Sequence, residues 1–294
     1  MDTQNHTSLS ISADNAERIG DQLMREGKLS ATDLTRISAY QEEHHVPFGD
    51  AANALGVLSR KEIDIAVAQQ FGYPWNPGVG TANPALYALA DPFGAKAEAL
   101  RALRLRLQLT GVGRPDMHPT LAVLSPQRGD GRSTLAANLA VSFAELGLKT
   151  LLVDADLRNP SLHTLFGAAI GPGLCSLLAG RSAEYGYINP IPGFSGLCVL
   201  PSGPVPPNAS ELLTRPAFSQ FLSTAREHFD LVILDTAPTA VYGDALYAVT
   251  ASGASSAAIM VARRDHTLVK GLETLTDNLT AVGVPTLGVV FKQA

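Results

Sequence analysis

A glycine-bearing turn separates an apolar run from a helical pattern at residues 121–135, Leu-Ala-Val-Leu-Ser-Pro-Gln-Arg-Gly-Asp-Gly-Arg-Ser-Thr-Leu. This order of strand, tight loop and helix is typical of a phosphate-binding loop. Gly129 and Gly131 permit backbone conformations that are closed to residues with a Cβ, so that consecutive N–H groups can face an anion. The helix N-terminus adds partial positive charge at the same point. The residues predicted to bind a nucleotide's phosphates are Gly129, Asp130, Gly131, Arg132, Ser133 and Thr134.

The loop departs from the general phosphate-loop pattern at two positions. Arg132 stands where a lysine is expected, and Pro126 occupies the place of the first glycine, five residues before Gly131. Ser133 is placed to give a hydroxyl to Mg2+, and Thr134 is placed to reach a phosphate oxygen. A plain strand-to-helix turn is the alternative for this stretch taken alone, because such short patterns also occur without a ligand.

Two other apolar runs end in acidic residues. Residues 149–158, Lys-Thr-Leu-Leu-Val-Asp-Ala-Asp-Leu-Arg, carry Asp154 and Asp156, and residues 229–235 end in Asp235. The carboxyl ends of parallel strands meet at one edge of a sheet, where open sheets bind their ligands. Side chains alternate along a strand, so Asp154 and Asp156 are expected on the same side. A bound metal ion would offset the repulsion between two such neighbouring carboxylates.

These acids predict a magnesium site. Asp235 ends a stretch with the form of a Walker B element, whose aspartate orients Mg2+ through a water or hydroxyl. A helix N-cap together with a surface acid is the alternative for Asp154 and Asp156. The predicted metal site comprises Ser133, Asp154, Asp156 and Asp235.

Alternating strand and helix patterns must position these residues. The expected strands are residues 121–124, 149–154, 197–200, 229–235, 257–261 and 286–290. The expected helices are residues 95–109, 135–146 and 268–279, with a further helix beginning at Ser210. Such alternation predicts an α/β fold with a doubly wound, mainly parallel sheet. Residues 171–216 are rich in Gly, Pro and Ser and carry no catalytic constellation.

A repeat lies near the N-terminus, where Gly20 and Ser30 recur 29 residues later as Gly49 and Ser59. A fixed period of this size indicates a duplicated supersecondary unit. Each unit is expected to be a short helix, a glycine C-cap and a second helix with Ser as its N-cap. The acids that complete capping boxes with these serines are Asp33 and Glu62. The sequence therefore predicts a compact helical module over residues 17–75.

The composition is that of a globular chain, with 294 residues and 46% hydrophobic residues, enough for about two domains. A net charge of -5 argues against non-specific nucleic-acid binding, which needs a cationic surface and would here require a local basic patch. Cys175 and Cys198 lie in no metal-binding spacing and are expected to be reduced thiols of a cytosolic protein. No signal peptide and no apolar run of about 18 residues is apparent, so a soluble protein is expected.

Composition also places the domain boundaries. Residues 1–16 are polar and aperiodic, which predicts a disordered tail. Residues 76–92 turn to Pro, Gly, Asn and Ala, which predicts a linker. The second domain is therefore expected over residues 93–294.

The helix expected at residues 95–109 carries Glu98, Arg101 and Arg104 at every third position, on or near one face. A solvated charged face is one explanation. The other is a contact between subunits, in which arginines of one copy pair with carboxylates of the next.

These motifs together resemble the bacterial tyrosine kinases of capsule and exopolysaccharide export, the CpsD/CapB-like family with a P-loop NTPase-type fold. The resemblance spans roughly residues 93–292 and rests on the phosphate loop, on Asp154-Ala-Asp156-Leu-Arg158, on Asp235 and on the Glu-x-x-Arg-x-x-Arg helix. The Asp-x-Asp element, called Walker A′, is its most specific part. Within the family the chain is most similar to the EpsG-type kinase partner of the chain-length determinant.

The resemblance implies ATP- and Mg2+-dependent phosphoryl transfer to protein tyrosines. Arg132 would contact the β and γ phosphates, and Asp154 and Asp156 would organise Mg2+ and the attacking phenol, with Asp154 as the base. The ring contact through which subunits phosphorylate one another would be made by Glu98, Arg101 and Arg104. A membrane chain-length determinant would be the activating partner, so the protein would lie in the cytoplasm, peripheral to the inner membrane.

Several features depart from the family pattern. Arg132 is flat and bulkier than lysine, no C-terminal tyrosine cluster is present, and Lys292 stands where an asparagine often reads adenine. The candidate phosphorylated residues are Tyr185, Tyr187, Tyr242 and Tyr247, each with core or loop packing as the alternative. Two other functions remain open: a ParA/MinD-like positioning ATPase, and a non-enzymatic nucleotide-binding scaffold.

The helical module resembles the N-terminal domain of type II secretion and pilus ATPases, over residues 18–74. Ligand-binding versions of that domain bind cyclic di-GMP and open both repeats with an arginine. Here Arg18-Ile19-Gly20 fits, whereas the second repeat begins Pro47-Phe48-Gly49. Cyclic di-GMP binding and a packing or docking role are therefore both open.

Overall fold

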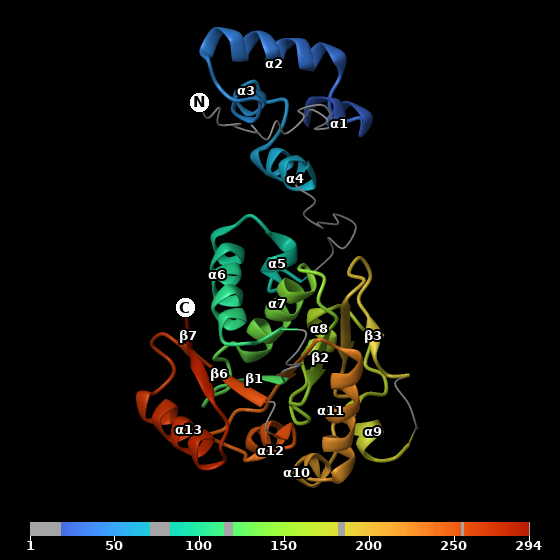
Figure 1. Ribbon diagram of the computed structural model, residues 1–294, viewed down its shortest axis with the longest axis vertical. Coiled ribbons are helices and arrows are strands. Elements are labelled where there is room, and N and C mark those ends of the chain that lie inside the picture. Colours follow the sequence, from blue (N-terminus) through green and yellow to red (C-terminus); the bar gives the residue numbers. More distant parts are fainter. Residues whose placement is uncertain (1–18, 71–82, 115–119, 182–185, 254–255, 294) are drawn as a thin grey trace, which may run out of the picture. The chain divides into compact units, whose positions relative to one another are not determined.

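The computed structural model describes residues 19–70, 83–114, 120–181, 186–253 and 256–293 (Figure 1). The predictions for the tail at residues 1–16, for Arg18, for residues 76–82 and for Tyr185 fall outside the described residues. The chain divides into two compact units, Met1–Trp75 and Asn76–Ala294, and each is described by itself. In the part of the chain that is described, no helix combines the length and apolar character needed to cross a membrane.

The first unit is helical, as the repeat predicts. Its helices are α1 Ile19–Arg25, α2 Ala31–His44, α3 Phe48–Ala54 and α4 Arg60–Gln70. Ser30 and Asp33 form the predicted capping box at α2, and Ser59 and Glu62 exchange the same pair of hydrogen bonds at α4. The glycines between the paired helices adopt the left-handed conformation, with φ of 70° at Gly27 and 66° at Gly56.

The repeated glycines of α1 and α3 permit close helix packing. A Cβ on Gly20 would lie 2.8 Å from Cδ1 of Leu34, and a Cβ on Gly49 would lie 2.8 Å from Cγ2 of Ile63. Leu34 and Ile63 are themselves one repeat length apart. Each first helix therefore packs against the equivalent residue of its own second helix, and the repeated glycine serves packing in both units.

The second unit is built on a seven-stranded sheet in the order β3-β4-β2-β5-β1-β6-β7. Every neighbouring pair is parallel except β3 with β4, which confirms the predicted mainly parallel α/β fold. The strands are β1 Thr120–Leu124, β2 Thr150–Asp154, β3 Asn189–Pro190, β4 Leu197–Leu200, β5 Leu231–Asp235, β6 Ser256–Arg263 and β7 Thr286–Lys292. The central strands β1, β2 and β5 are buried along their whole length, as apolar runs in a parallel sheet require.

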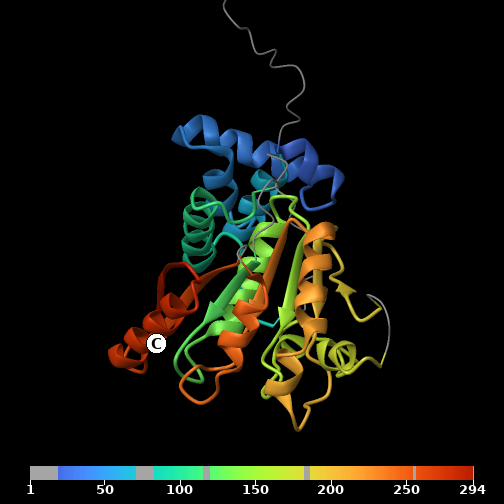
Figure 2. The same cartoon turned by 60° about the horizontal axis from the view of Figure 1, so that its bottom comes forward.

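Helices cover both faces of this sheet (Figures 1 and 2). One face packs against α5 Tyr87–Ala90, α6 Ala95–Leu109, α7 Arg132–Ala144 and α8 Leu162–Leu165. The other packs against α9 Leu174–Leu178, α10 Ala209–Leu213, α11 Pro216–His228, α12 Asp244–Thr250 and α13 Val269–Ala281. The strand residues alternate between the two cores, so that Leu121 faces one and Ala122 the other.

The second half of the expected linker is part of the domain core instead. Leu86 and Ala88 are buried with α7, and the side chain of Asn138 on α7 binds the N–H of Ala88 at 2.9 Å and the carbonyl of Ala85 at 2.8 Å. The linker prediction is therefore wrong for the described residues 83–92. The Pro- and Gly-rich composition of residues 76–92 concealed the few apolar side chains that pack.

Candidate active site

The phosphate loop connects β1 to α7 at the carboxyl edge of the sheet. Gly129 and Gly131 have φ of 87° and 106°, the left-handed region that favours glycine, and Gly131 is the N-cap of α7. Helix α7 begins at Arg132, so the loop and the helix N-terminus meet as the sequence predicts. Thirteen residues of helix then carry the dipole that favours an anion at this end.

The two predicted acid-ending strands are neighbours. Strand β2 pairs with β5 in a register that places Asp154 opposite Asp235. Both residues have no exposed surface, and three of their four carboxylate oxygens have no hydrogen-bond partner: Asp154 Oδ1 and both oxygens of Asp235. The fourth, Asp154 Oδ2, accepts hydrogen bonds from the N–H groups of Ser161 and Leu162, each at 3.1 Å.

Burial raises the pKa of both carboxyl groups. The pKa of Asp154 is raised well above its usual range by desolvation and by the charge of Asp235. The pKa of Asp235 rises to about 7 through desolvation, against the opposing effects of the Ser133 hydroxyl and the Arg132 guanidinium. Two adjacent buried carboxyl groups with three unpartnered oxygens are costly to ionise, so this pair calls for a cation.

The residues present fit a magnesium ion. Ser133 follows Arg132 in the first turn of α7, and its hydroxyl is near enough to lower the pKa of Asp235 without making a well-formed hydrogen bond, so hydroxyl and carboxylate oxygens converge here. No cluster of three or more His, Cys, Asp or Glu side chains able to hold a metal occurs in the described ranges. Mg2+ does not need such a cluster, since it is usually held by one or two carboxylates together with waters and substrate phosphates. The predicted roles of Ser133, Asp154 and Asp235 in holding Mg2+ stay predictions.

Asp156 makes a different set of contacts. Its Oδ1 accepts hydrogen bonds from the N–H groups of Arg158 at 3.3 Å and Asn159 at 3.0 Å, and its Oδ2 lies 3.9 Å from the guanidinium of Arg132. Desolvation raises the pKa of Asp156, although the backbone donors and Arg132 counteract it. Asp154 and Asp156 therefore both accept hydrogen bonds from the backbone after β2, while Asp154 keeps an oxygen without a partner. Neither is a surface acid, because both are buried.

The side chain of Arg132 is turned into the wall of the loop. It is 6% exposed, and its guanidinium donates to the carbonyls of Thr236 and Gln127, each at 2.8 Å, and to the hydroxyl of Ser125. Burial lowers the pKa of Arg132, and the surrounding carboxylates of Asp235, Asp156 and Asp130 oppose that effect. The predicted contact of Arg132 with the β and γ phosphates stays a prediction, and three of its donor interactions are already made within the protein.

Asp130 connects the phosphate loop to the segment after β6. Its buried carboxylate accepts hydrogen bonds from the N–H of Gln127 at 2.8 Å and the hydroxyl of Thr267 at 2.5 Å, and lies 3.0 Å from Nδ1 of His266. Burial opposes ionisation, but these donors together lower the pKa of Asp130. His266 and Thr267 were missed in the sequence analysis, because nothing in a single sequence pairs residues so far apart.

A second cluster that the sequence did not indicate lies beyond Asp156. Arg158 donates from Nε to Asp244 at 2.6 Å and from its terminal nitrogen to Ser210 at 2.9 Å, and Ser210 donates to Asp244 at 2.6 Å. The guanidinium carbon of Arg158 lies 4.0 Å from the ring centre of Tyr242, a cation–π contact. Asp244 also raises the pKa of Asp156, so this cluster borders the candidate active site electrostatically.

The residues predicted to contact other subunits lie on α6. The carboxylate of Glu98 pairs with Arg101 at 2.6 Å, and Arg104 donates to the carbonyl and hydroxyl of Ser142 on α7. Glu98 is largely exposed, whereas Arg104 is mostly buried against α7. The subunit contact stays a prediction, and Arg104 already has a structural role within one copy.

The remaining candidate tyrosines differ in their surroundings. Tyr187 packs at the margin of the core, Tyr242 rests on Arg158, and Tyr247 is 50% exposed. Packing therefore accounts for Tyr187, and the position of Tyr242 is set by its cation–π contact.

Comparison with known proteins identifies the family. A ParA family model, described as NUBPL iron-transfer P-loop NTPase, matches residues 116–292. Tyrosine-protein kinase YwqD of Bacillus subtilis (strain 168) is 37% identical over 158 residues, which are 54% of this chain and 65% of YwqD. Tyrosine-protein kinase CpsD of Streptococcus agalactiae is 32% identical over 197 residues, which are 67% of this chain and 82% of CpsD.

A solved structure agrees with these relatives. The kinase domain of Escherichia coli tyrosine kinase ETK is 31% identical, with a TM-score of 0.66 over 71% of this chain and 80% of that domain. The chain spans less than two thirds of the length of YwqD, so the relatives' names do not by themselves establish its activity. The sequence identity, the sheet topology and the paired acids agree, and the chain belongs to the bacterial tyrosine-protein kinases, with a ParA-type P-loop NTPase fold.

Proposed function

We propose that this protein is an ATP- and Mg2+-dependent protein tyrosine kinase that phosphorylates itself and acts in exopolysaccharide export. One observation carries the proposal. Asp154 and Asp235 lie side by side at the end of the sheet, fully buried, with three carboxylate oxygens that lack a donor. A divalent cation bound with a nucleotide at the adjoining phosphate loop would compensate for that burial.

The chain's own residues supply positioning and charge, which is most of what phosphoryl transfer requires. In the proposed reaction the phenol oxygen of a tyrosine forms a bond to the γ-phosphorus, and the bond to the ADP oxygen breaks. The phenol proton passes to Asp154, whose raised pKa makes it a stronger base than an ordinary carboxylate. The N–H groups at the start of α7 would hold the phosphates, and bound Mg2+ would neutralise their developing charge.

Partners belong to the same proposal. We infer that a membrane chain-length determinant activates the kinase, and that copies of the chain phosphorylate one another in a ring through Glu98, Arg101 and Arg104. The exposure of Glu98 supports such a contact, because its carboxylate can reach another copy. A cytoplasmic position beside the inner membrane follows from this partnership.

A second candidate is a non-enzymatic scaffold that binds nucleotide without transferring phosphate. The contacts of Arg132 favour it, because that guanidinium binds Thr236, Gln127 and Ser125 in the protein. If Arg132 mainly stabilises the phosphate loop, the site can still bind phosphates through backbone N–H groups while phosphate transfer is slow.

Incubation of the purified full-length chain with labelled ATP and Mg2+, followed by detection of phosphotyrosine, tests the proposal. We expect labelled tyrosine in the wild-type chain and none in Asp154→Asn, whose amide oxygen can still accept from the backbone N–H groups that Asp154 caps. Circular dichroism and thermal melting check that the variant is folded. Phosphate release without phosphotyrosine would indicate a positioning ATPase, nucleotide binding with neither product would indicate the scaffold, and undiminished labelling of Asp154→Asn would refute the assigned base.

A further inference from the structure

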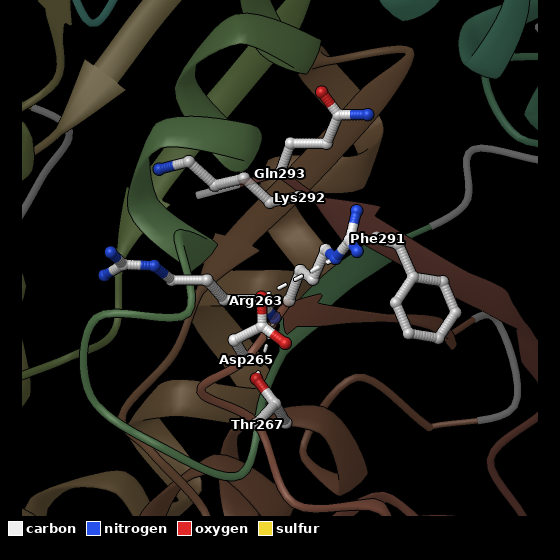
Figure 3. A pocket seen from close by; sticks show the side chains of 7 residues that line it. Arg263, Asp265, Thr267, Phe291, Lys292 and Gln293 are labelled. Carbon is white, nitrogen blue, oxygen red and sulfur yellow. Dashed lines mark hydrogen bonds and ion pairs between the residues drawn. The ribbon is translucent and has the colours of Figure 1, made fainter.

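Lys292, the last residue of β7, lies across the phosphate loop. A Cβ built on Gly131 would be 3.0 Å from Cδ of Lys292 and 3.4 Å from its Nζ. Figure 3 shows the Lys292 side chain extending toward α7, whereas Phe291 points to the opposite side. The ammonium therefore lies beside the residue that caps the phosphate-binding end of α7.

The backbone at Lys292 is held in place. Lys292 pairs with Arg263 in the parallel ladder of β6 and β7, and its carbonyl accepts a hydrogen bond from the N–H of Arg264 at 3.0 Å. Arg263, Lys292 and neighbouring residues line a pocket of about 480 Å³ at the ends of these two strands. The lysine thus projects from a fixed strand end at the mouth of a pocket beside the phosphate loop.

The charge of the site calls for a further cation. Four buried carboxylates surround the loop, belonging to Asp130, Asp154, Asp156 and Asp235. Arg132 is the cation among them, and its donors bind Ser125, Gln127 and Thr236. Arg158 is paired with Asp244. A nucleotide's phosphates bring further negative charge, which these arginines are poorly placed to meet.

Lys292 is free to meet that charge. No carboxylate among the described residues lies within ion-pair distance of its Nζ. A lysine ammonium is a compact point charge on a flexible stem, suited to phosphate oxygens, and it has no acceptor with which to recognise the amino group of adenine. An asparagine at this position would offer both a donor and an acceptor to a base, and lysine offers donors alone.

We propose that Lys292 is a phosphate-binding residue of this site, supplying from the end of β7 the positive charge that the phosphate loop of other family members takes from its own lysine. The proposal rests on the proposed function only in that a nucleotide binds at the loop. Arg132 then has a mainly structural role in the phosphate loop. The Lys292 ammonium makes a phosphate contact that ATP and ADP can form and a nucleoside cannot.

Equilibrium binding to the purified full-length chain tests this assignment. ATP, ADP and adenosine would each be titrated with Mg2+ by calorimetry or by displacement of a fluorescent ATP analogue. Lys292→Met keeps the length of the side chain and removes its charge, and we expect affinity for ATP and ADP to fall on the order of tenfold, as for loss of a charged hydrogen bond. Affinity for adenosine should be unchanged, and Lys292→Arg should retain most of the affinity for ATP.

Lys149→Met provides the matched control. Lys149 is exposed and precedes β2, so it lies at the opposite edge of the sheet from Asp154, and its replacement should leave all three affinities unchanged. Thermal melting of each variant confirms that the fold is intact.

Two results would overturn the inference. One is wild-type affinity of Lys292→Met for ATP, and the other is an equal loss for adenosine and ATP, which would assign the lysine to the base. The binding measurement does not depend on phosphotyrosine formation. If ATP binding required Lys292 but the chain phosphorylated no tyrosine, the role of Lys292 would be supported and the proposed kinase activity would be refuted. Absence of any nucleotide binding by the wild-type chain would refute both.

Discussion

Acidic residues at the repeats of the helical module and at the active site of the P-loop domain differ in whether their oxygens have hydrogen-bond donors. In the described part of the module, the acids of the repeats accept hydrogen bonds from the serines they cap, at the surface. In the domain, Asp154 and Asp235 are fully buried, and three of their oxygens have no donor. Polar groups whose hydrogen bonds are made within the protein are accounted for by the fold itself. Buried polar groups that lack hydrogen-bond partners need another explanation, which here is a bound ligand.

The same contrast appears in the acidity of these groups. Hydrogen bonds from Ser30 and Ser59 lower the pKa values of Asp33 and Glu62. Desolvation raises the pKa values of Asp154 and Asp235. Asp33 and Glu62 therefore stabilise the module in their charged form, whereas Asp154 and Asp235 destabilise the domain in theirs.

Replacing Asp235 by Asn should separate activity from stability. We expect phosphotyrosine formation to fall by at least about a hundredfold, because a group that holds Mg2+ and the phosphates in place is lost. The domain should at the same time become more stable, since a neutral amide replaces a buried carboxylate beside Asp154, and each kcal/mol gained raises Tm by about 2–4 °C. Kinetic assays and calorimetry on one preparation measure the rate of phosphotyrosine formation and the Tm of the domain. A lowered Tm would contradict the inference that the buried Asp235 carboxylate destabilises the domain.

The two units should respond to pH in opposite directions. The pKa of folded Asp235 is about 7, above that of an ordinary carboxyl, so the contribution of Asp235 to the stability of the domain is fully present below about pH 4 and is lost as pH rises toward 7. The pKa values of Asp33 and Glu62 are depressed, so their contribution is present at neutral pH and is lost below about pH 4. Calorimetry of the full chain from pH 3 to pH 8 should show two transitions moving apart. Asp235→Asn should make the Tm of the domain less dependent on pH. If the Tm values of both units shifted with pH in the same direction, the proposed difference between their acidic residues would be contradicted.

Arg132 resembles the residues of the module, because its Nε and Nη1 atoms donate hydrogen bonds within the chain. Arg132→Ala removes three buried hydrogen bonds, to Ser125, Gln127 and Thr236, and we expect a loss of about 3 kcal/mol in the free energy of unfolding of the domain. Urea unfolding measures it, with Arg128→Ala on the same loop as the exposed control. Equal stability of the two variants would mean that the arginine is not a structural part of the loop.

The smallest expected effect distinguishes the two repeats. A Cβ at position 49 meets Cγ2 of Ile63, a β-branched side chain that cannot easily rotate, so Gly49→Ala should destabilise the module by about 1 kcal/mol. A Cβ at position 20 comes too close only to the flexible end of Leu34 and lies at ordinary contact distance from Phe48, so the higher helix propensity of alanine should offset most of the cost of Gly20→Ala. Hydrogen exchange of α3 and α4 in the full chain measures the difference. Equal protection in both variants would contradict the packing role of the glycine.

The sequence predicted the parts of the molecule that depend on local order or on strand ends. Apolar runs located the strands, and the rule that parallel strands end at one edge predicted that Asp154 and Asp235 would meet. Spacing of three residues was enough for both capping boxes. These features need only neighbours in the chain or a general rule of sheet topology.

Contacts between distant loops could not be predicted in this way. Arg132 binds the carbonyl of Thr236, 104 residues away, and Asp130 binds Thr267, 137 residues away. No periodicity records such pairs, so the motifs predicted only a phosphate contact for Arg132 and placed Lys292 at a position that often reads adenine. The packed segment at residues 83–92 was missed for a related reason, because its partner Asn138 lies in another helix.

The hydrogen bonds of Asp130 have a consequence for dividing the protein into fragments. A piece that ended after β5 would contain Ser133, Asp154 and Asp235, and by motif it would look complete. It would lack Thr267 and His266, two of the groups that hold the carboxylate at the centre of the phosphate loop. The smallest functional unit therefore extends at least past β6 to Thr267, and a fragment chosen from the three motifs alone would leave the phosphate loop without part of its support.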